Sequence, residues 1–282
     1  MNELTTLRQR LTQPALYLLA MLSLTLATHS QTMSAPTGPT PAPKTKWPIK
    51  ENVYVIPNFR FGTGESLPEL KLRYLTLGSP HRNSAGHVDN AVLLLHGTGG
   101  DENDLLQLGE MVSPPSALLS PRGRVTENGM PRFFRRLAEG VFDEDDVRRR
   151  ALELADFVEE ARGRHGIARP FALGYSNGAN IAAALMLLRP GTLAGAALLR
   201  AMVPLSDPPH SDLSGVPVLI ASGKADPIVP ASNSARLAAM LRDAGAVVSH
   251  QALPVGHQLS QADLALVRDW LTMVDIPEPV AI

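Results

Sequence analysis

Short apolar runs alternate with amphipathic stretches along most of the chain. The apolar runs lie at residues 91–97, 117–121, 170–175, 194–200, 216–223 and 247–254. Their length and uniform hydrophobicity are typical of strands covered on both faces. The amphipathic stretches begin near residues 143, 177, 231 and 260, and apolar residues recur in them at three- and four-residue spacing. This alternation predicts one α/β domain with a mostly parallel central sheet and helices on both faces.

Two runs with a different pattern precede these strands. The stretches VYVIPNFRF and ELKLRYLTLG alternate apolar and polar residues, and Leu70, Leu72 and Tyr74 fall on one face of the second. A period of two residues is typical of a strand with one buried face. We therefore expect an antiparallel strand pair at the amino-terminal side of the sheet.

The first fifty residues differ from the rest. Arg8 and Arg10 precede an apolar run at residues 15–27, which is shorter than the roughly 20 residues that a membrane-spanning helix needs. The pattern predicts a signal peptide within residues 1–30, with an uncleaved membrane anchor or a buried helix as alternatives. Residues 31–50 are rich in Pro and Thr, as in a flexible linker, which leaves residues 51–282 for the folded domain. We expect an exported protein, periplasmic or secreted, with no stable membrane insertion after signal cleavage.

Composition excludes several classes of function. The chain has 282 residues, 44% of them hydrophobic, and a formal charge of -1, which suits a soluble globular protein with one sizeable core. This balance of charge provides no basic surface for nucleic acid. The absence of cysteine excludes disulfides, thiolate catalysis and iron–sulfur clusters. No pair of histidines has metal-ligand spacing, so neither a metal nor a cofactor is expected.

Ser176 lies between two glycines, in the sequence Gly174-Tyr175-Ser176-Asn177-Gly178. The motif alone is weak, because a small residue in a tight turn would look the same. Its context is more specific, since an apolar strand leads directly into it and a helical stretch follows. A nucleophile elbow has this arrangement, and its sharp turn leaves no room for side chains at the flanking glycines. The sequence therefore indicates Ser176 as a nucleophile.

A serine hydroxyl needs a base, and the base needs an orienting carboxylate. Asp226 and His257 each follow a predicted buried strand, Asp226 on a loop bounded by Gly and Pro and His257 on a glycine-flanked loop. Their chain order, Ser, acid, His, is the one that this topology favours. Asp226 also precedes Pro227, so its alternative role is that of a turn former. Asp207 is the second choice of acid. The other histidines fit less well: His165 at a helix end, His250 within a strand, His210 in a Pro-rich loop, and His29, His81 and His87 ahead of the motifs.

The tetrahedral oxyanion formed by serine attack needs backbone donors. The amide of Asn177 is one candidate, because it directly follows the nucleophile, and the amide of Thr98 in HGTGGDENDL is the other. His96, at the start of this segment, is expected to be a structural hydrogen-bonding residue rather than a base.

One long insertion, residues 121–143, lies near the predicted site. Met130, Phe133 and Phe134 are candidates for an apolar wall that binds the acyl or alcohol group, and Arg132 and Arg135 for contacts to an acidic group. Ordinary core packing of the two phenylalanines is the alternative. So short an insertion predicts a minimal lid and an open site.

With these residues assembled, the chain resembles the α/β-hydrolase superfamily, and within it the small carboxylesterase/phospholipase and dienelactone-hydrolase-like branch. The resemblance rests on LLLHGTGGDENDLL, SPRG, ENGMPRFFRR, GYSNGANIAAAL, GKADPIVP and GHQLSQ. It implies a triad of Ser176, Asp226 and His257 that hydrolyses carboxylic esters through an acyl-enzyme. Dienelactone hydrolases proper use a cysteine, which this chain lacks.

The segment ahead of His96 resembles a second group. IPNFRFGTGESLPELKLRYLTLGSP is similar to exported relatives of homoserine O-acetyltransferase, although that group carries a large lid and a methionine after the serine. The chain thus looks like a junction of two related folds. The expected function is that of a serine carboxylesterase for small or short-chain esters. An acyltransferase, a lysophospholipase-type esterase and a non-catalytic binding protein are the alternatives.

Overall fold

The computed structural model describes residues 45–60, 66–114 and 116–274, which belong to a compact unit that comprises residues 42–282. The predicted signal peptide at residues 1–30 and most of the predicted linker lie outside the described residues. Among the residues that are described, no helix combines the length and the hydrophobicity needed to cross a membrane.

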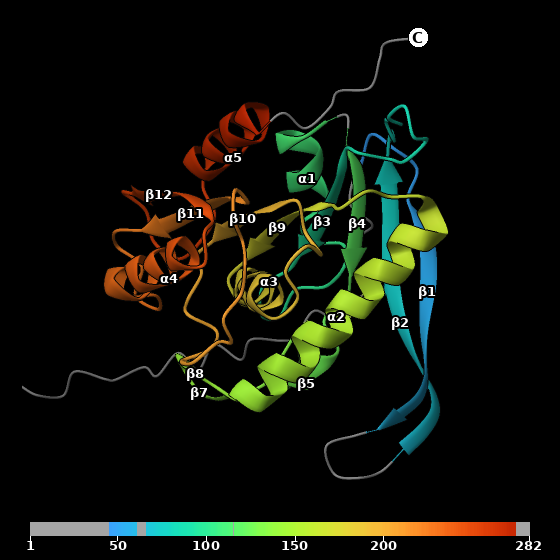
Figure 1. Cartoon of the computed structure of the whole chain (residues 1–282). Helices are drawn as coiled ribbons and strands as arrows, with labels where there is room; N and C mark the ends of the chain where they lie inside the picture. Colours follow the sequence, from blue (N-terminus) through green and yellow to red (C-terminus); the bar gives the residue numbers. More distant parts are fainter. Residues whose placement is uncertain (1–44, 61–65, 115, 275–282) are drawn as a thin grey trace, which may run out of the picture. The chain divides into compact units, whose positions relative to one another are not determined.

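An eight-stranded sheet forms the centre of the unit (Figure 1). Across the sheet, the strands are β1 (Lys50–Arg60), β2 (Ser66–Gly78), β4 (Ala117–Pro121), β3 (Ala91–Leu95), β9 (Phe171–Tyr175), β10 (Gly195–Leu199), β11 (Pro217–Gly223) and β12 (Val247–Leu253). All neighbours from β4 to β12 are parallel, whereas β1 with β2 and β2 with β4 are antiparallel. The prediction of a mostly parallel sheet with an antiparallel pair at its amino-terminal side is therefore confirmed.

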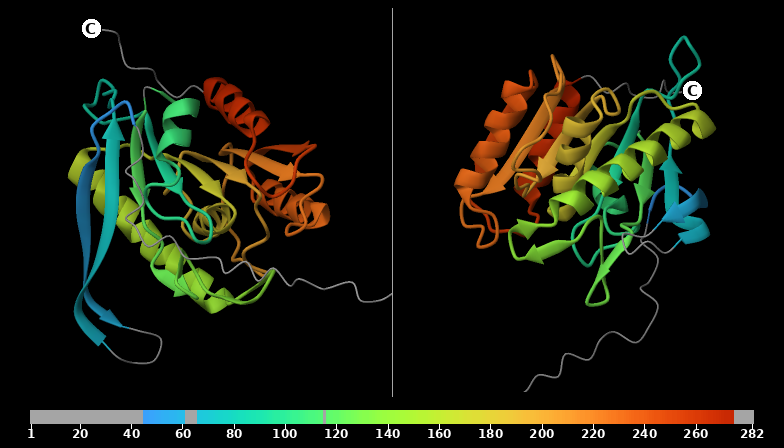
Figure 2. Two further views of the ribbon diagram at one scale, coloured as in Figure 1. Left: turned by 180° about the vertical axis from the view of Figure 1, so that it is seen from behind. Right: turned by 60° about the horizontal axis from the view of Figure 1, so that its bottom comes forward.

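Helices cover both faces of the sheet (Figures 1 and 2). α2 (Glu144–His165), α3 (Asn177–Leu188) and α4 (Ala231–Asp243) pack on one face, and α1 (Leu106–Val112) and α5 (Gln261–Met273) pack on the other. Successive strand residues alternate between the two cores: Leu93 and Leu95 join the first, and Val92 and Leu94 join the second. The uniformly apolar strands of the sequence are thus explained by burial on both faces.

The ends of α2 follow from local chemistry. The side chain of Asp143 accepts a hydrogen bond from the amide of Asp146 at 3.1 Å and caps the helix. Acidic residues occupy the first turn and basic residues the last, which complements the helix dipole. Gly166, with φ of 64°, ends the helix in the left-handed conformation that glycine adopts readily.

Two short hairpins occupy the insertion between β4 and α2. They are β5 (Val125–Glu127) with β6 (Met130–Arg132), and β7 (Arg136–Ala138) with β8 (Val141–Phe142). No helical lid is built from these residues, in agreement with the expectation of a minimal lid.

The amino-terminal ribbon of β1 and β2 extends past the neighbouring strands (Figures 1 and 2). One face of it packs on α2, where the rings of Tyr54 and Tyr74 both contact Phe157 edge to face. Ahead of β1, Trp47 packs against the core, and the amide of Lys46 donates to Glu110 at 2.9 Å. The last residues of the predicted linker therefore contact the folded domain.

Candidate active site

Ser176 lies at a sharp turn between β9 and α3, with φ of 51° and ψ of -113°. Non-glycine residues seldom adopt a positive φ, so the backbone here is strained. A Cβ atom at Gly178 would lie 1.9 Å from the carbonyl oxygen of Leu95, and one at Gly174 would lie 2.7 Å from the backbone of Ala179. Only glycine fits at either position, which is the geometry expected of a nucleophile elbow.

Three residues that are distant in the sequence form a hydrogen-bonded chain at this turn. His257 Nε2 lies 3.0 Å from Ser176 Oγ, and His257 Nδ1 lies 2.8 Å from Asp226 Oδ2. The Asp226 side chain is fully buried, and 16% of the His257 side chain is exposed. With Nδ1–H donating to the carboxylate, Nε2 is left as an acceptor for the serine hydroxyl.

Asp226 performs two structural tasks at once. Its Oδ2 atom contacts His257, and its Oδ1 atom accepts hydrogen bonds from the amides of Ile228 at 2.8 Å and Val229 at 3.0 Å. Burial opposes ionisation, but these two amides and the His257 ring outweigh it and lower the pKa of Asp226. The turn-forming and histidine-orienting alternatives therefore both describe this residue.

Thr98 and Asn177, the predicted oxyanion donors, line the hollow beside Ser176. Asn177 is the first residue of α3, so its amide has no acceptor within the helix. The next amides along the Thr98 loop are engaged, since Gly99 N–H donates to Pro131 O at 3.0 Å and Gly100 N–H to Gly97 O at 3.2 Å. Thr98 and Asn177 thus line the same hollow as Ser176, and donation by their amides stays a prediction.

His96 fixes the loop that carries Thr98. It is buried, and its Nδ1–H donates to the carbonyl of Gly97 at 2.7 Å, while Nε2 accepts from the amide of Gly123 at 2.8 Å. The ring also packs against Phe133, with the centroids 4.7 Å apart. Burial lowers the pKa of His96. These contacts describe a neutral, structural histidine, as the sequence indicated.

The protonation of His96 predicts how stability depends on pH. Because the pKa is lowered on folding, the unfolded chain binds this proton before the folded protein does as pH falls. The contribution of neutral His96 to the free energy of unfolding is therefore fully present above the ordinary histidine pKa of about 6.5 and declines as pH falls below it. Burial lowers the pKa of His165 and His250 as well, in the same direction. We expect His96→Gln to be less stable at pH 7.5 and to lose less stability between about pH 6.5 and pH 5.

Urea unfolding at a series of pH values measures this effect. Above pH 7, the variant and the wild type should show parallel dependences on pH. An equal loss of unfolding free energy below pH 6.5 in both proteins would contradict the assignment of His96.

The predicted substrate-binding residues do not surround Ser176 as a group. Phe134 is fully buried against Phe142, and Phe133 is 6% exposed and packs on His96. Both side chains belong to the core, which is the alternative considered above. The insertion that carries them packs closely on the domain, so both rings fill space in its interior. Met130 is 38% exposed and lies beside Gly99 at the loop of Thr98.

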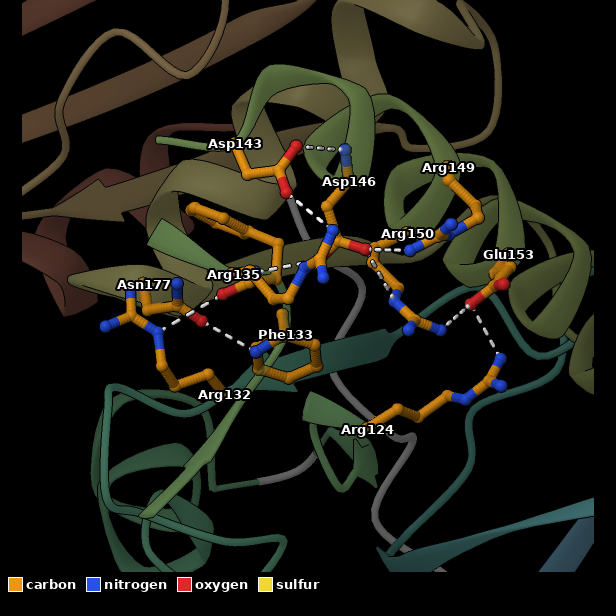
Figure 3. A network of polar contacts seen from close by, with 11 residues as sticks. Arg124, Arg132, Phe133, Arg135, Asp143, Asp146, Arg149, Arg150, Glu153 and Asn177 are labelled. Carbon is orange, nitrogen blue, oxygen red and sulfur yellow. Dashed lines mark hydrogen bonds and ion pairs between the residues drawn. The ribbon is translucent and has the colours of Figure 1, made fainter. Parts of the chain in front are cut away.

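The two arginines considered for an acidic substrate group are occupied by the protein (Figure 3). Arg132 donates to Glu127 at 2.8 Å and to the carbonyl of Phe134 at 3.2 Å. Arg135 is largely exposed and donates to Asp143 at 2.6 Å. Of the two, only Arg132 lines the hollow beside Ser176.

Several polar residues of this hollow were not anticipated, among them Arg136, Glu139 and Asn180. Arg136 pairs with Glu139 and, at 2.9 Å, with Glu127. Asn180 is buried and accepts a hydrogen bond from the amide of Met202 at 2.8 Å. A polar residue in the otherwise apolar helix NIAAALMLL was the available signal for Asn180. Arg136 and Glu139 had none, because they lie in an insertion without regular periodicity.

The rejected candidates lie elsewhere. His165 Nε2 contacts the hydroxyl of Tyr74 at 3.0 Å, on the side of the sheet that faces α2. His250 contacts Ser222 from strand β12 at 2.9 Å. Asp207 is exposed in the connection between β10 and β11. Within the described part of the chain, no group of histidine and carboxylate side chains could hold a metal ion.

Comparison with known proteins identifies the family. The model of the phospholipase/carboxylesterase family matches residues 82–275. A Bacillus subtilis (strain 168) protein named as a hydrolase, MhqD, is 48% identical over 192 residues, covering 67% of this chain and 96% of that protein. The crystal structure of the Bacillus cereus carboxylesterase is 41% identical with a TM-score of 0.68, covering 72% of this chain and 95% of that one. A carboxylesterase from Mesorhizobium loti is 35% identical with a TM-score of 0.66, covering 71% and 94%. The chain therefore belongs to the phospholipase/carboxylesterase family of hydrolases, with the α/β-hydrolase fold.

Proposed function

We propose that this protein is a serine carboxylesterase in which Ser176, His257 and Asp226 form the catalytic triad. The observation that carries the proposal is the unbroken hydrogen-bonded chain from Asp226 through His257 to Ser176 at the strained elbow. The solved carboxylesterases to which the chain is similar support the same reaction class.

The geometry suggests how an ester would be cleaved. His257 Nε2 accepts the proton of Ser176 as the oxygen attacks the ester carbonyl carbon, and the carbonyl oxygen becomes an oxyanion beside the Thr98 and Asn177 amides. The imidazolium, oriented by Asp226, then donates its proton to the departing alcohol and leaves an acyl-enzyme. Water attacks this acyl group through the same histidine and releases the acid.

The hollow beside Ser176 supports a preference for small or short-chain esters. Its walls include charged and amide side chains from the insertion and from α3, whereas the rings of Phe133 and Phe134 are buried in the core. A long acyl chain would displace water from these ion pairs, and removing charged groups from water is costly even when they are paired. The structure thus favours short acyl groups over those of a lysophospholipase.

Labelling with a fluorophosphonate tests the proposal. We expect covalent modification at one site, mapped by mass spectrometry to the peptide that contains Ser176, because the probe reacts with a serine activated by a histidine. His257→Ala should be labelled far more slowly, and heat-denatured protein not at all. Labelling at another residue, or equally fast labelling of His257→Ala, would refute the triad.

Acyl transfer is the second candidate, on the strength of the resemblance ahead of His96 to homoserine O-acetyltransferase relatives. The reaction with p-nitrophenyl acetate, run with and without added alcohols or amino alcohols, separates it from hydrolysis. A hydrolase yields acetate in both cases, whereas a transferase yields the acetylated acceptor. Export directed by residues 1–30 remains a further proposal, made on the sequence alone.

A further inference from the structure

The loop that carries His257 is held by side chains from two neighbouring strand ends. Its three consecutive carbonyl groups, those of Gly256, His257 and Gln258, each accept a hydrogen bond. Arg200 Nε donates to Gly256 O at 2.9 Å, and Arg200 Nη2 donates to Gln258 O at 3.1 Å. Between them, the hydroxyl of Tyr175 donates to the carbonyl of His257 itself at 3.2 Å. The peptide groups on both sides of the imidazole are therefore fixed.

Arg200 is held as firmly as the loop that it contacts. The residue is fully buried, and its Nη1 and Nη2 atoms each donate to a carboxylate oxygen of Asp263 at 2.8 Å. Nη1 also donates to Ala221 O at 3.2 Å. A guanidinium has five N–H donors, and the contacts to Gly256, Gln258, Ala221 and the two oxygens of Asp263 use all of them.

Asp263 connects the guanidinium to the helix that follows the loop. Its Oδ2 atom accepts from the amide of Ser260 at 2.8 Å and from the Ser260 hydroxyl at 2.7 Å, at the start of α5. Burial opposes ionisation of the carboxyl group, but Arg200 and Ser260 outweigh it and lower the pKa of Asp263. The histidine loop is thus anchored to Arg200 directly and, through Asp263, at its far end.

The same strand end also positions the nucleophile. The amide of Ser176 donates to the carbonyl of Leu199 at 2.8 Å, and Arg200 is the next residue along the chain. Its backbone has φ of 57°, an unusual value for a non-glycine residue. The serine backbone and the histidine backbone are therefore both tied to residues 199–200.

We propose that Arg200, together with Tyr175, is a positioning residue that sets the separation of His257 Nε2 from Ser176 Oγ. The hydrogen bonds from Arg200 and Tyr175 to the carbonyls of residues 256–258 are called the clamp below. The inference rests on the proposed function, because it assigns the clamp a role in proton transfer between these two atoms. Lysine would not replace the arginine, since its ammonium group is a single point of donation and cannot span both carbonyls and the carboxylate. A misplacement of about 1 Å at a reacting group can reduce a rate on the order of 100-fold.

Two variants test the clamp. Arg200→Lys keeps a positive charge next to Asp263 and removes most of the bonds to the loop, and Tyr175→Phe removes one oxygen and keeps the ring. With p-nitrophenyl acetate, we expect kcat to fall by about 10-fold to 100-fold in Arg200→Lys and by several-fold in Tyr175→Phe, with KM changed by less than about twofold. Asn90→Ala is the matched control. Asn90 is fully buried and hydrogen-bonded to the backbone of residues 79 and 81, and it precedes β3 at the end of that strand away from Ser176. It should lower stability and leave kcat per folded molecule unchanged.

Each substitution is then repeated in His257→Ala protein. If the clamp acts through His257, the residual rate of His257→Ala should fall by less than about twofold when either substitution is added. An equal loss in both backgrounds, or a wild-type kcat in Tyr175→Phe, would overturn the clamp. Failure of the triad itself gives a different result, namely wild-type activity in His257→Ala alone. Should Arg200→Lys not fold, Tyr175→Phe decides the question.

Discussion

Replacement of Ser176 by alanine should reduce kcat for p-nitrophenyl acetate at least about 1000-fold, because the acyl-enzyme can no longer form. The hydroxyl is the only group removed, and within the described part of the chain its side-chain partner is His257, at 3.0 Å. Little change in the unfolding temperature is expected. Activity and unfolding should both be measured on protein shown to be folded by circular dichroism.

Ser176→Gly is the informative companion variant. It is equally inactive, but glycine adopts the φ of 51° found here without strain. We expect Ser176→Gly to be more stable than Ser176→Ala by about 1 kcal/mol or more, since strained backbone positions cost about 1–3 kcal/mol. Substantial turnover by either variant would refute the assignment of the nucleophile. Equal stability of the two would refute strain at the elbow.

The second large effect is expected on stability, at Gly178. An alanine Cβ there would lie 1.9 Å from Leu95 O and 2.6 Å from His96 O. These are backbone atoms of β3 and of the residue after it, so the conflict cannot be relieved by turning a side chain. Gly178→Ala should therefore lose at least about 3 kcal/mol of unfolding free energy, the upper part of the range for overpacking, and most of its activity.

Gly163→Ala is the matched control for Gly178→Ala. Gly163 lies in α2, is exposed, and has no neighbouring atom within 4 Å of an added Cβ. The substitution should stabilise the protein by about 0.5 kcal/mol, because alanine favours helix. Urea unfolding of both variants provides the comparison. Wild-type stability in Gly178→Ala would show that β3 and α3 are not packed as described.

Much of the site could be predicted from the sequence because its signals are local. The elbow depends on adjacent residues, and Asp226 and His257 follow apolar runs whose carboxyl ends must meet at one edge of a parallel sheet. The boundaries of α3 and β4 match the predicted ones for the same reason. In contrast, α1 was not predicted, since its seven residues are too few to establish a helical period.

Pairings between distant residues could not be predicted. Arg200 and Asp263 are 63 residues apart; Arg200 ends a predicted strand and Asp263 lies in the first turn of a predicted helix, where charged residues are ordinarily exposed to solvent. The insertion between β4 and α2 posed a related difficulty. Phe133 and Phe134 are apolar whether they face a substrate or the core, and hydrophobicity alone does not separate these cases.

The ribbon of β1 and β2 lies outside the candidate active site, which bears on how its sequence can change in evolution. Its described residues supply none of the hydrogen-bonded chain or of the hollow beside Ser176, and the family match begins only at residue 82, after β2 has ended. Recombination upstream of that point would exchange this hairpin and leave Ser176, Asp226 and His257 in the chain. The hairpin still contributes to both cores, since Leu72 and Tyr74 belong to one and Leu75 and Leu77 to the other, so a replacement hairpin must place apolar residues at the same positions.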